Sequence, residues 1–157
     1  MRRAREAGKL VSFDVNFRAD IFRSKRRALT AYRDIIAFAD IVKFSEDEAE
    51  TFGKSYLESL QQKLVCITLG KNGCKWRFRG AERTLATIDV KPVDTTGAGD
   101  AFYAGVLSRL DKTSPKDWTE ETLSAALAYG NVCGALNTLG HGAIDHLPSQ
   151  EEVARWL

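Results

Sequence analysis

The residues with the clearest chemical potential are the nine of DTTGAGDAF, Asp94 to Phe102, which contain two glycines and two aspartates and run directly into an apolar stretch. Glycines 97 and 99 allow the amides of Gly97, Ala98, Gly99 and Asp100 to point one way. At the start of a helix such amides predict an anion site, and phosphate fits it. Asp100 would stay ionised there and could accept a hydroxyl proton. An anion cradle beside a base is typical of phosphoryl transfer to an alcohol.

The elements that must position this loop alternate between strands and helices. Apolar runs predict strands at residues 9–13, 40–44 and 63–69, a half-exposed strand at 74–79, and a further strand before Pro92. Apolar residues at helical spacing and capping patterns predict helices at residues 25–39, 45–53, 100–110 and 119–140, and from Ser149 onward. Asn72-Gly73 predicts a tight turn between two of the strands.

This alternation predicts an α/β fold, with a mostly parallel, doubly wound sheet and helices on both faces. Ligands of such folds gather at the carboxyl ends of the strands. Three polar loops follow predicted strands in this chain: DVNFR after the first, SEDE after the second and GKNG after the third. Their convergence predicts a ligand site independently of any motif.

Composition excludes several classes of protein. The 157 residues carry 23 basic and 21 acidic side chains, a formal charge of +2, which gives no footprint for nucleic acid or for an anionic membrane. Three cysteines without metal-type spacing indicate reduced thiols, and no apolar run reaches membrane length. We therefore expect a cytoplasmic protein.

DTTGAGDAF resembles the C-terminal signature of the ribokinase-like (PfkB) family of carbohydrate kinases nearly residue for residue. VSFDVNFR, TLGKNG and YGNVCGALNTLGHGAIDHLPSQEEV are similar to further parts of that family, and the last is closest to fructokinases. The resemblance implies ATP-dependent phosphorylation of a sugar hydroxyl, on fructose or a similar ketose. It also implies that residues 1–157 form a single ATP-side, C-terminal portion of a kinase domain, which lacks the N-terminal strands and the lid.

The resemblance also implies roles for individual residues. Asp100 would be the catalytic base. Gly97, Ala98 and Gly99 would form the anion hole for the transferring phosphoryl group. Thr68, Gly70 and Gly73 would border ATP, and Asn131 would lie near the adenine. Asn16 and Arg18 would face the phosphates. Arg18 has an alternative interpretation as a plain surface residue.

Two metal sites are implied in the same way. The family's NxxE motif, which organises Mg²⁺ through water, appears here with serine as its first residue, from Ser45 to Glu48. Glu48 thus has two readings, as metal organiser and as the partner of Ser45 in a capping box. Asp94, Thr96 and Gly142 match positions that surround K⁺ in many relatives.

The expected ligands are ATP and a small sugar. We also expect a homo-oligomer, or association with a missing N-terminal half, because absent strands would leave apolar surface uncovered. Two alternatives stay open at this point. One is a non-catalytic nucleotide-binding or interaction module that needs a partner half, and the other is a nucleoside kinase of the same family.

Overall fold

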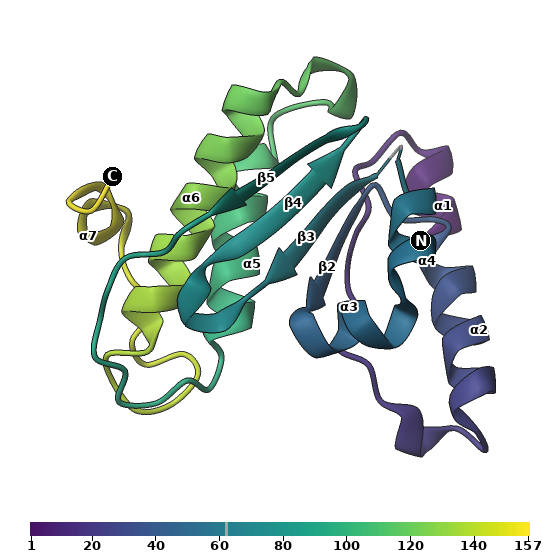
Figure 1. Ribbon diagram of the computed structural model, residues 1–157. Helices are drawn as coiled ribbons and strands as arrows, with labels where there is room; N and C mark the ends of the chain where they lie inside the picture. Colours follow the sequence, from purple (N-terminus) through teal and green to yellow (C-terminus); the bar gives the residue numbers. More distant parts are fainter. Residues whose placement is uncertain (62) are drawn as a thin grey trace. The chain divides into compact units, whose positions relative to one another are not determined.

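The computed structural model describes residues 1–61 and 63–157 (Figure 1). Its strands are β1 (Ser12–Asp14), β2 (Ile41–Ser45), β3 (Leu64–Thr68), β4 (Cys74–Phe78) and β5 (Ala81–Leu85). Its α-helices are α1 (Arg2–Glu6), α2 (Lys25–Ile36), α3 (Glu46–Phe52), α4 (Lys54–Ser59), α5 (Ala98–Leu110), α6 (Glu120–Asn137) and α7 (Gln150–Ala154). Short 3₁₀ helices are η1 (Ala19–Ile21), η2 (Gly70–Asn72) and η3 (Pro115–Asp117). None of the helices in these residues has both the length and the hydrophobicity that crossing a bilayer requires.

The α/β alternation is confirmed, and the strands are hydrogen-bonded in the order β1-β2-β3-β4-β5. β1 and β2 run parallel, with Asp14 opposite Lys43. Only Arg79 and Gly80 connect β4 to β5, and both have positive φ. Because parallel strands need a much longer crossover, this pair must be antiparallel. The sheet is therefore mixed, with less parallel pairing than we expected.

The chain divides into two compact units, and each is described by itself. Unit 1 comprises Met1–Ile67 and Trp76–Glu82, and unit 2 comprises Thr68–Lys75 and Arg83–Leu157. We predicted that residues 1–157 form a single ATP-side portion of a kinase domain, and the division into two units does not test this prediction.

Unit 1 has its core in strands that read as continuous apolar runs. Ile41, Val42 and Phe44 of β2 have no solvent exposure, as expected for a strand covered on both faces. The helices of the unit begin where the capping rules predict. α2 follows Ser24, whose side chain accepts a hydrogen bond from the Arg27 backbone N–H, and α3 follows the capping box predicted at residue 45.

Unit 2 contains the pair α5 and α6, which pack closely through glycine. A Cβ atom on Gly130 would lie 2.7 Å from the backbone oxygen of Phe102, and one on Gly134 would lie 2.9 Å from that of Ala98. The glycines of α6 therefore allow α5 to approach closely. Because Ala98 is the first residue of α5, this contact fixes the start of α5 against α6.

Candidate phosphate and nucleotide site

Gly97 sets the geometry at the start of α5. It is the N-cap residue, and its φ of +76° lies in the left-handed region that residues other than glycine rarely adopt. A Cβ atom there would lie 2.8 Å from the Cα atom of Ala143. Backbone conformation and close approach both require glycine at this position. Gly99 lies inside α5, so of these two glycines only Gly97 takes a left-handed backbone angle.

Three of the four amides predicted to form an anion site are free to do so. In the part of the chain that the structure describes, the backbone N–H groups of Gly97, Gly99 and Asp100 have no acceptor. Ala98 differs from the expectation, because its N–H donates to the backbone oxygen of Thr95 at 3.2 Å. The first turn of a helix leaves such donors without intrahelical partners, and the helix dipole adds positive potential. The loop thus offers three N–H groups to an anion.

Asp100 lies in the first turn of α5 and is exposed. Its carboxylate is therefore accessible to a solute that reaches the start of the helix. Gly99, its neighbour in the chain, lines a cavity of unit 2. These positions are compatible with the base predicted from the sequence, whose role stays a prediction.

Asp94 joins two loops of unit 2. Its Oδ1 accepts hydrogen bonds from Thr96, from the backbone N–H at 2.9 Å and from the hydroxyl at 2.7 Å. Its Oδ2 accepts from the backbone N–H of Gly142 at 3.0 Å. The Thr96 hydroxyl, then the Gly142 and Thr96 amides, lower the pKa of this carboxyl to about 2. The structure thus brings together the three residues predicted to surround K⁺.

A cavity of about 340 Å³ lies within unit 2, a volume in the range of small-molecule sites. The side chains and backbone that line it come from three parts of the unit. They are Thr68, Gly70, Lys71, Gly73, Thr87, Ile88, Asp89, Val90, Pro92, Thr95, Ala98, Gly99, Phe102, Asn131, Gly134, Ala135 and Thr138. All four residues predicted to contact the nucleotide are among them, together with two of the predicted anion hole. Residues 87–90 were not predicted to line a site, because their side chains form no motif.

Gly73 and Asn131 hold one wall of this cavity. Gly73 has φ of +90°, and a Cβ atom on it would lie 2.1 Å from the backbone oxygen of Leu85. The Nδ2 atom of Asn131 donates to the backbone oxygens of Leu85, at 3.1 Å, and of Ala86, at 3.2 Å. The Thr87 hydroxyl donates to the backbone oxygen of Asn131 at 3.1 Å. Asn131 therefore lines the cavity with its amide donors already used by the wall.

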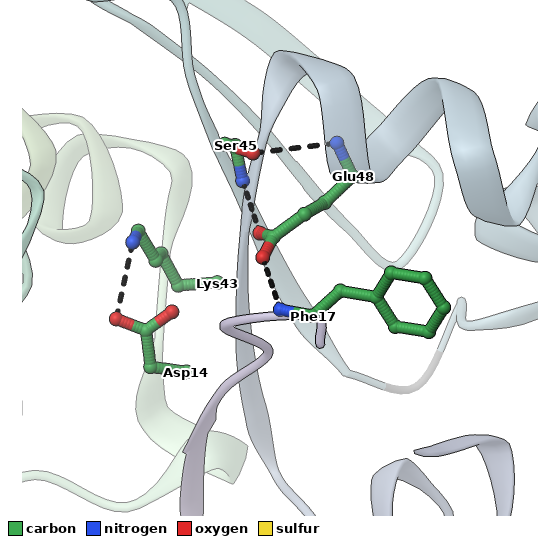
Figure 2. Close-up of polar contacts among 5 residues, drawn as sticks. All are labelled: Asp14, Phe17, Lys43, Ser45 and Glu48. Atoms are coloured by element: carbon green, nitrogen blue, oxygen red, sulfur yellow. Dashed lines mark hydrogen bonds and ion pairs between the residues drawn. The ribbon is translucent and has the colours of Figure 1, made fainter. Parts of the chain in front are cut away.

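The metal-organising pair expected in unit 1 forms a capping box (Figure 2). The Ser45 hydroxyl accepts from the Glu48 backbone N–H at 3.3 Å, and Glu48 Oε2 accepts from the Ser45 backbone N–H at 2.7 Å. Glu48 Oε1 accepts from the Phe17 backbone N–H at 2.6 Å. Across residues 1–61 and 63–157, no group of three or more His, Cys, Asp or Glu side chains could hold a metal ion. The capping-box reading is confirmed, and the metal-organising role stays a prediction.

A partly buried ion pair beside the capping box was not predicted from the sequence. Lys43 Nζ lies 3.0 Å from Asp14 Oδ2, and the two side chains are 11% and 22% exposed (Figure 2). Their pairing follows from the register of β1 and β2, which places the two residues opposite each other. Charge at the ends of these strands is therefore balanced locally.

The loop of Asn16 and Arg18 also belongs to unit 1. Asn16 has φ of +44°, and the Tyr32 hydroxyl donates to its backbone oxygen at 3.2 Å. The same hydroxyl accepts from the Arg18 backbone N–H at 3.2 Å. Tyr32 thus holds the loop in a conformation that is uncommon outside glycine. Both loop residues are exposed, and the prediction that they face phosphates stays a prediction.

Comparison with known proteins shows what the chain is similar to. Residues 1–150 match the family model described as pfkB family carbohydrate kinase. Fructokinase of Vibrio alginolyticus is 38% identical over 167 residues, covering 100% of this chain and 53% of that protein. Fructokinase-1 of Zea mays is 37% identical over 168 residues, covering 100% and 51%. The chain thus spans about half the length of these relatives.

Solved structures give the same extent of similarity. Fructokinase from Vibrio cholerae O395, with fructose, ADP and calcium bound, superposes with a TM-score of 0.89 at 33% identity, covering 99% of this chain and 53% of that chain. Aminoimidazole riboside kinase from Salmonella enterica, with aminoimidazole riboside and an ATP analogue, gives 0.87 at 32% identity, covering 99% and 54%. The fold is therefore the ribokinase-like α/β fold that the sequence predicts.

Proposed function

Because the chain belongs to the pfkB family of carbohydrate kinases, we propose that it supplies the ATP-side half of an enzyme that transfers the terminal phosphoryl group of MgATP to a sugar hydroxyl. The single observation that carries this proposal is the cavity of unit 2, whose lining ends at the start of α5, next to amides without acceptors. The DTTGAGDAF signature and this cavity support a place in the C-terminal, ATP-side half.

In this proposal the nucleotide lies in the cavity, bordered by Thr68, Gly70 and Gly73. Its terminal phosphates reach the N–H groups of Gly97 and Gly99, which stabilise the charge that spreads over the transferring group. The volume of about 340 Å³ is sufficient for part of a nucleotide in an open groove. Asn131 supports this site through the wall of residues 85–87.

Asp100 is the proposed base. Its carboxylate takes the proton from the sugar hydroxyl as that oxygen bonds to the γ-phosphorus and the bond from the γ-phosphorus to the bridging oxygen of ADP breaks. Mg²⁺ enters as part of the MgATP substrate. Asn16 and Arg18 facing the phosphates, and Glu48 with Ser45 orienting water around the metal, remain parts of the proposal.

A monovalent cation such as K⁺ fits the loops joined by Asp94 in donor type, because carbonyl oxygens coordinate K⁺ in proteins and Asp94 adds a carboxylate. Asp94, Thr96 and Gly142 would hold it, and it would add positive charge near the phosphate site. The hydrogen bonds that Asp94 already accepts tie these loops together without the ion. We therefore propose that K⁺ modulates phosphate binding at this site and is not required for the site to form.

The names of the relatives support fructose, or a similar ketose, as the phosphate acceptor. The neighbouring aminoimidazole riboside kinase keeps a ribonucleoside-like acceptor as an alternative. We propose a cytoplasmic location, which the odd number of cysteines and their lack of metal-type spacing support. A homo-oligomer, or association with a further half, would supply the contacts to the sugar.

A second candidate function is a non-catalytic nucleotide-binding module that needs a partner half. The observation that favours it is the coverage of only about half of each relative. Both candidates place a nucleotide in the cavity, and they differ in turnover.

Two assays test these proposals. Calorimetry of the chain with a non-hydrolysable ATP analogue and Mg²⁺ should give weak binding, and no heat at millimolar nucleotide would contradict both candidates. A phosphorylation assay with fructose, other sugars and a nucleoside, with and without K⁺, separates them. Phosphorylation of fructose that Asp100→Asn abolishes, while analogue binding persists, supports the kinase. Analogue binding without phosphorylation of any acceptor supports the module.

A further inference from the structure

Asn137, the last residue of α6, makes an unusual contact with the loop before α5. Its side chain is fully buried, with 0% exposure. Its Nδ2 donates to the backbone oxygen of Thr96 at 3.2 Å. Its Oδ1 has no hydrogen-bond partner in the part of the chain that the structure describes.

This contact fixes the orientation of one peptide group. The chain contains no cis peptide bond among the described residues, and in a trans peptide the carbonyl and the following N–H point in opposite directions. With the Thr96 carbonyl turned toward Asn137, the N–H of Gly97 must point away from it. That N–H is one of the amides without an acceptor.

We propose that Asn137 is a positioning residue, which turns the Thr96–Gly97 peptide so that the Gly97 N–H faces the phosphoryl group. The inference rests on the proposed function and adds to it a residue outside the DTTGAGDAF signature. Asn137 does not contact the phosphate. It acts through the Thr96 peptide.

Other contacts hold the rest of the loop, so the Thr96–Gly97 peptide is the part that Asn137 orients. Asp94 fixes the N–H side of Thr96, since its Oδ1 accepts from the Thr96 amide at 2.9 Å. Asn137 fixes the carbonyl side of the same residue. The left-handed φ of Gly97 then leads the chain directly into α5. Thr96 is thus held at its N–H by Asp94 and at its carbonyl by Asn137.

Stability alone does not account for an asparagine at this position. An unpaired oxygen in a fully buried site is costly, because it has lost its hydrogen bonds to water. The amide of Asn137 satisfies a single acceptor, the Thr96 carbonyl, and leaves its own oxygen unpaired. A leucine of similar volume would remove the unpaired oxygen and fill the same space. The presence of a polar group at such a cost supports a role for Asn137 in orienting Thr96.

The experiment is nuclear magnetic resonance of the full chain, comparing wild type with Asn137→Leu. The Thr96 carbonyl carbon and the Gly97 amide report the peptide orientation without ligand. The Gly97 amide also reports the binding of inorganic phosphate and of MgADP. Leu127→Ala is the control, since Leu127 is fully buried in the same helix and does not line the cavity.

We expect Asn137→Leu to shift both signals and to weaken phosphate binding by about tenfold or more, the worth of one hydrogen bond to a charged group. Its Tm should stay near that of the wild type, because removal of the unpaired Oδ1 offsets the lost bond to the Thr96 carbonyl. Leu127→Ala should lower Tm and leave both the Gly97 signal and phosphate affinity unchanged. This opposite pattern separates orientation from general stability.

Two results would overturn the inference alone: unchanged Thr96 and Gly97 signals in Asn137→Leu, or unchanged phosphate affinity where the wild type binds. Phosphate affinity that falls in Leu127→Ala as much as in Asn137→Leu would also overturn it, because stability would then explain the loss. A wild-type chain whose Gly97 amide responds to neither phosphate nor MgADP would overturn the proposed phosphate site, and this inference with it.

Discussion

Replacing Gly73 with alanine should destabilise unit 2 strongly. Gly73 has φ of +90° and ψ of −128°, a conformation that costs a residue with a side chain about 1–3 kcal/mol. The new Cβ would lie 2.1 Å from the Leu85 oxygen and 2.8 Å from the Ala86 carbonyl carbon. Both are backbone atoms, so the wall must move as a whole. Moving it breaks the two hydrogen bonds from Asn131, worth about 1 kcal/mol each, for a total of about 3–5 kcal/mol.

Gly70→Ala is the matched control for this prediction. Gly70 lies in the same turn with φ of +55°, and a Cβ there would meet no atom within 4 Å. It should therefore cost only the backbone penalty, about 1–2 kcal/mol. Urea unfolding followed by circular dichroism measures both variants. Equal free energies of unfolding for the two variants would refute the reasoning, because only Gly73 is predicted to clash.

Three further changes test other contacts of the site. Asn131→Ala should lower the free energy of unfolding by about 2 kcal/mol by leaving the Leu85 and Ala86 carbonyls without a donor, and calorimetry should show weaker binding of an ATP analogue. Asp94 has a pKa lowered from 3.8 to about 2. Its contribution to stability is therefore complete above about pH 3.8 and is lost as pH falls through about 2. In Tm measurements over a series of pH values, Asp94→Asn should remove this part of the fall in Tm at low pH. Tyr32→Phe keeps the ring contacts with Phe13, Phe17, Phe22 and Phe52 and removes the hydroxyl that holds Asn16 and Arg18, so urea unfolding should show a loss of about 1 kcal/mol.

Features set by neighbours in the sequence were the predictable ones. The capping boxes of Ser45 with Glu48 and of Ser149 with Glu152 follow from residues three positions apart. The start of α5 at the DTTGAGDAF loop follows from its glycines and the apolar run behind it. Local rules of this kind require no knowledge of the fold.

Features set by distant contacts could not be predicted. Asn131 bonds to residues 85 and 86, which are 46 and 45 positions away, and these partners depend on how Gly73 packs against the same segment. The pairing of Asp14 with Lys43 needs the register of two strands. The Ala98 amide is used by Thr95 because of the turn that the loop adopts, and residue types alone do not specify that turn.

A crystal structure of the chain with Mg²⁺ and a non-hydrolysable ATP analogue tests the central claim most directly. We expect the adenine ring of the analogue to lie within the cavity bordered by Gly70 and Gly73. We expect a terminal phosphate oxygen to lie within hydrogen-bonding distance of the Gly97 and Gly99 amides. An analogue bound elsewhere on the chain, or one whose phosphates lie away from the start of α5, would contradict it.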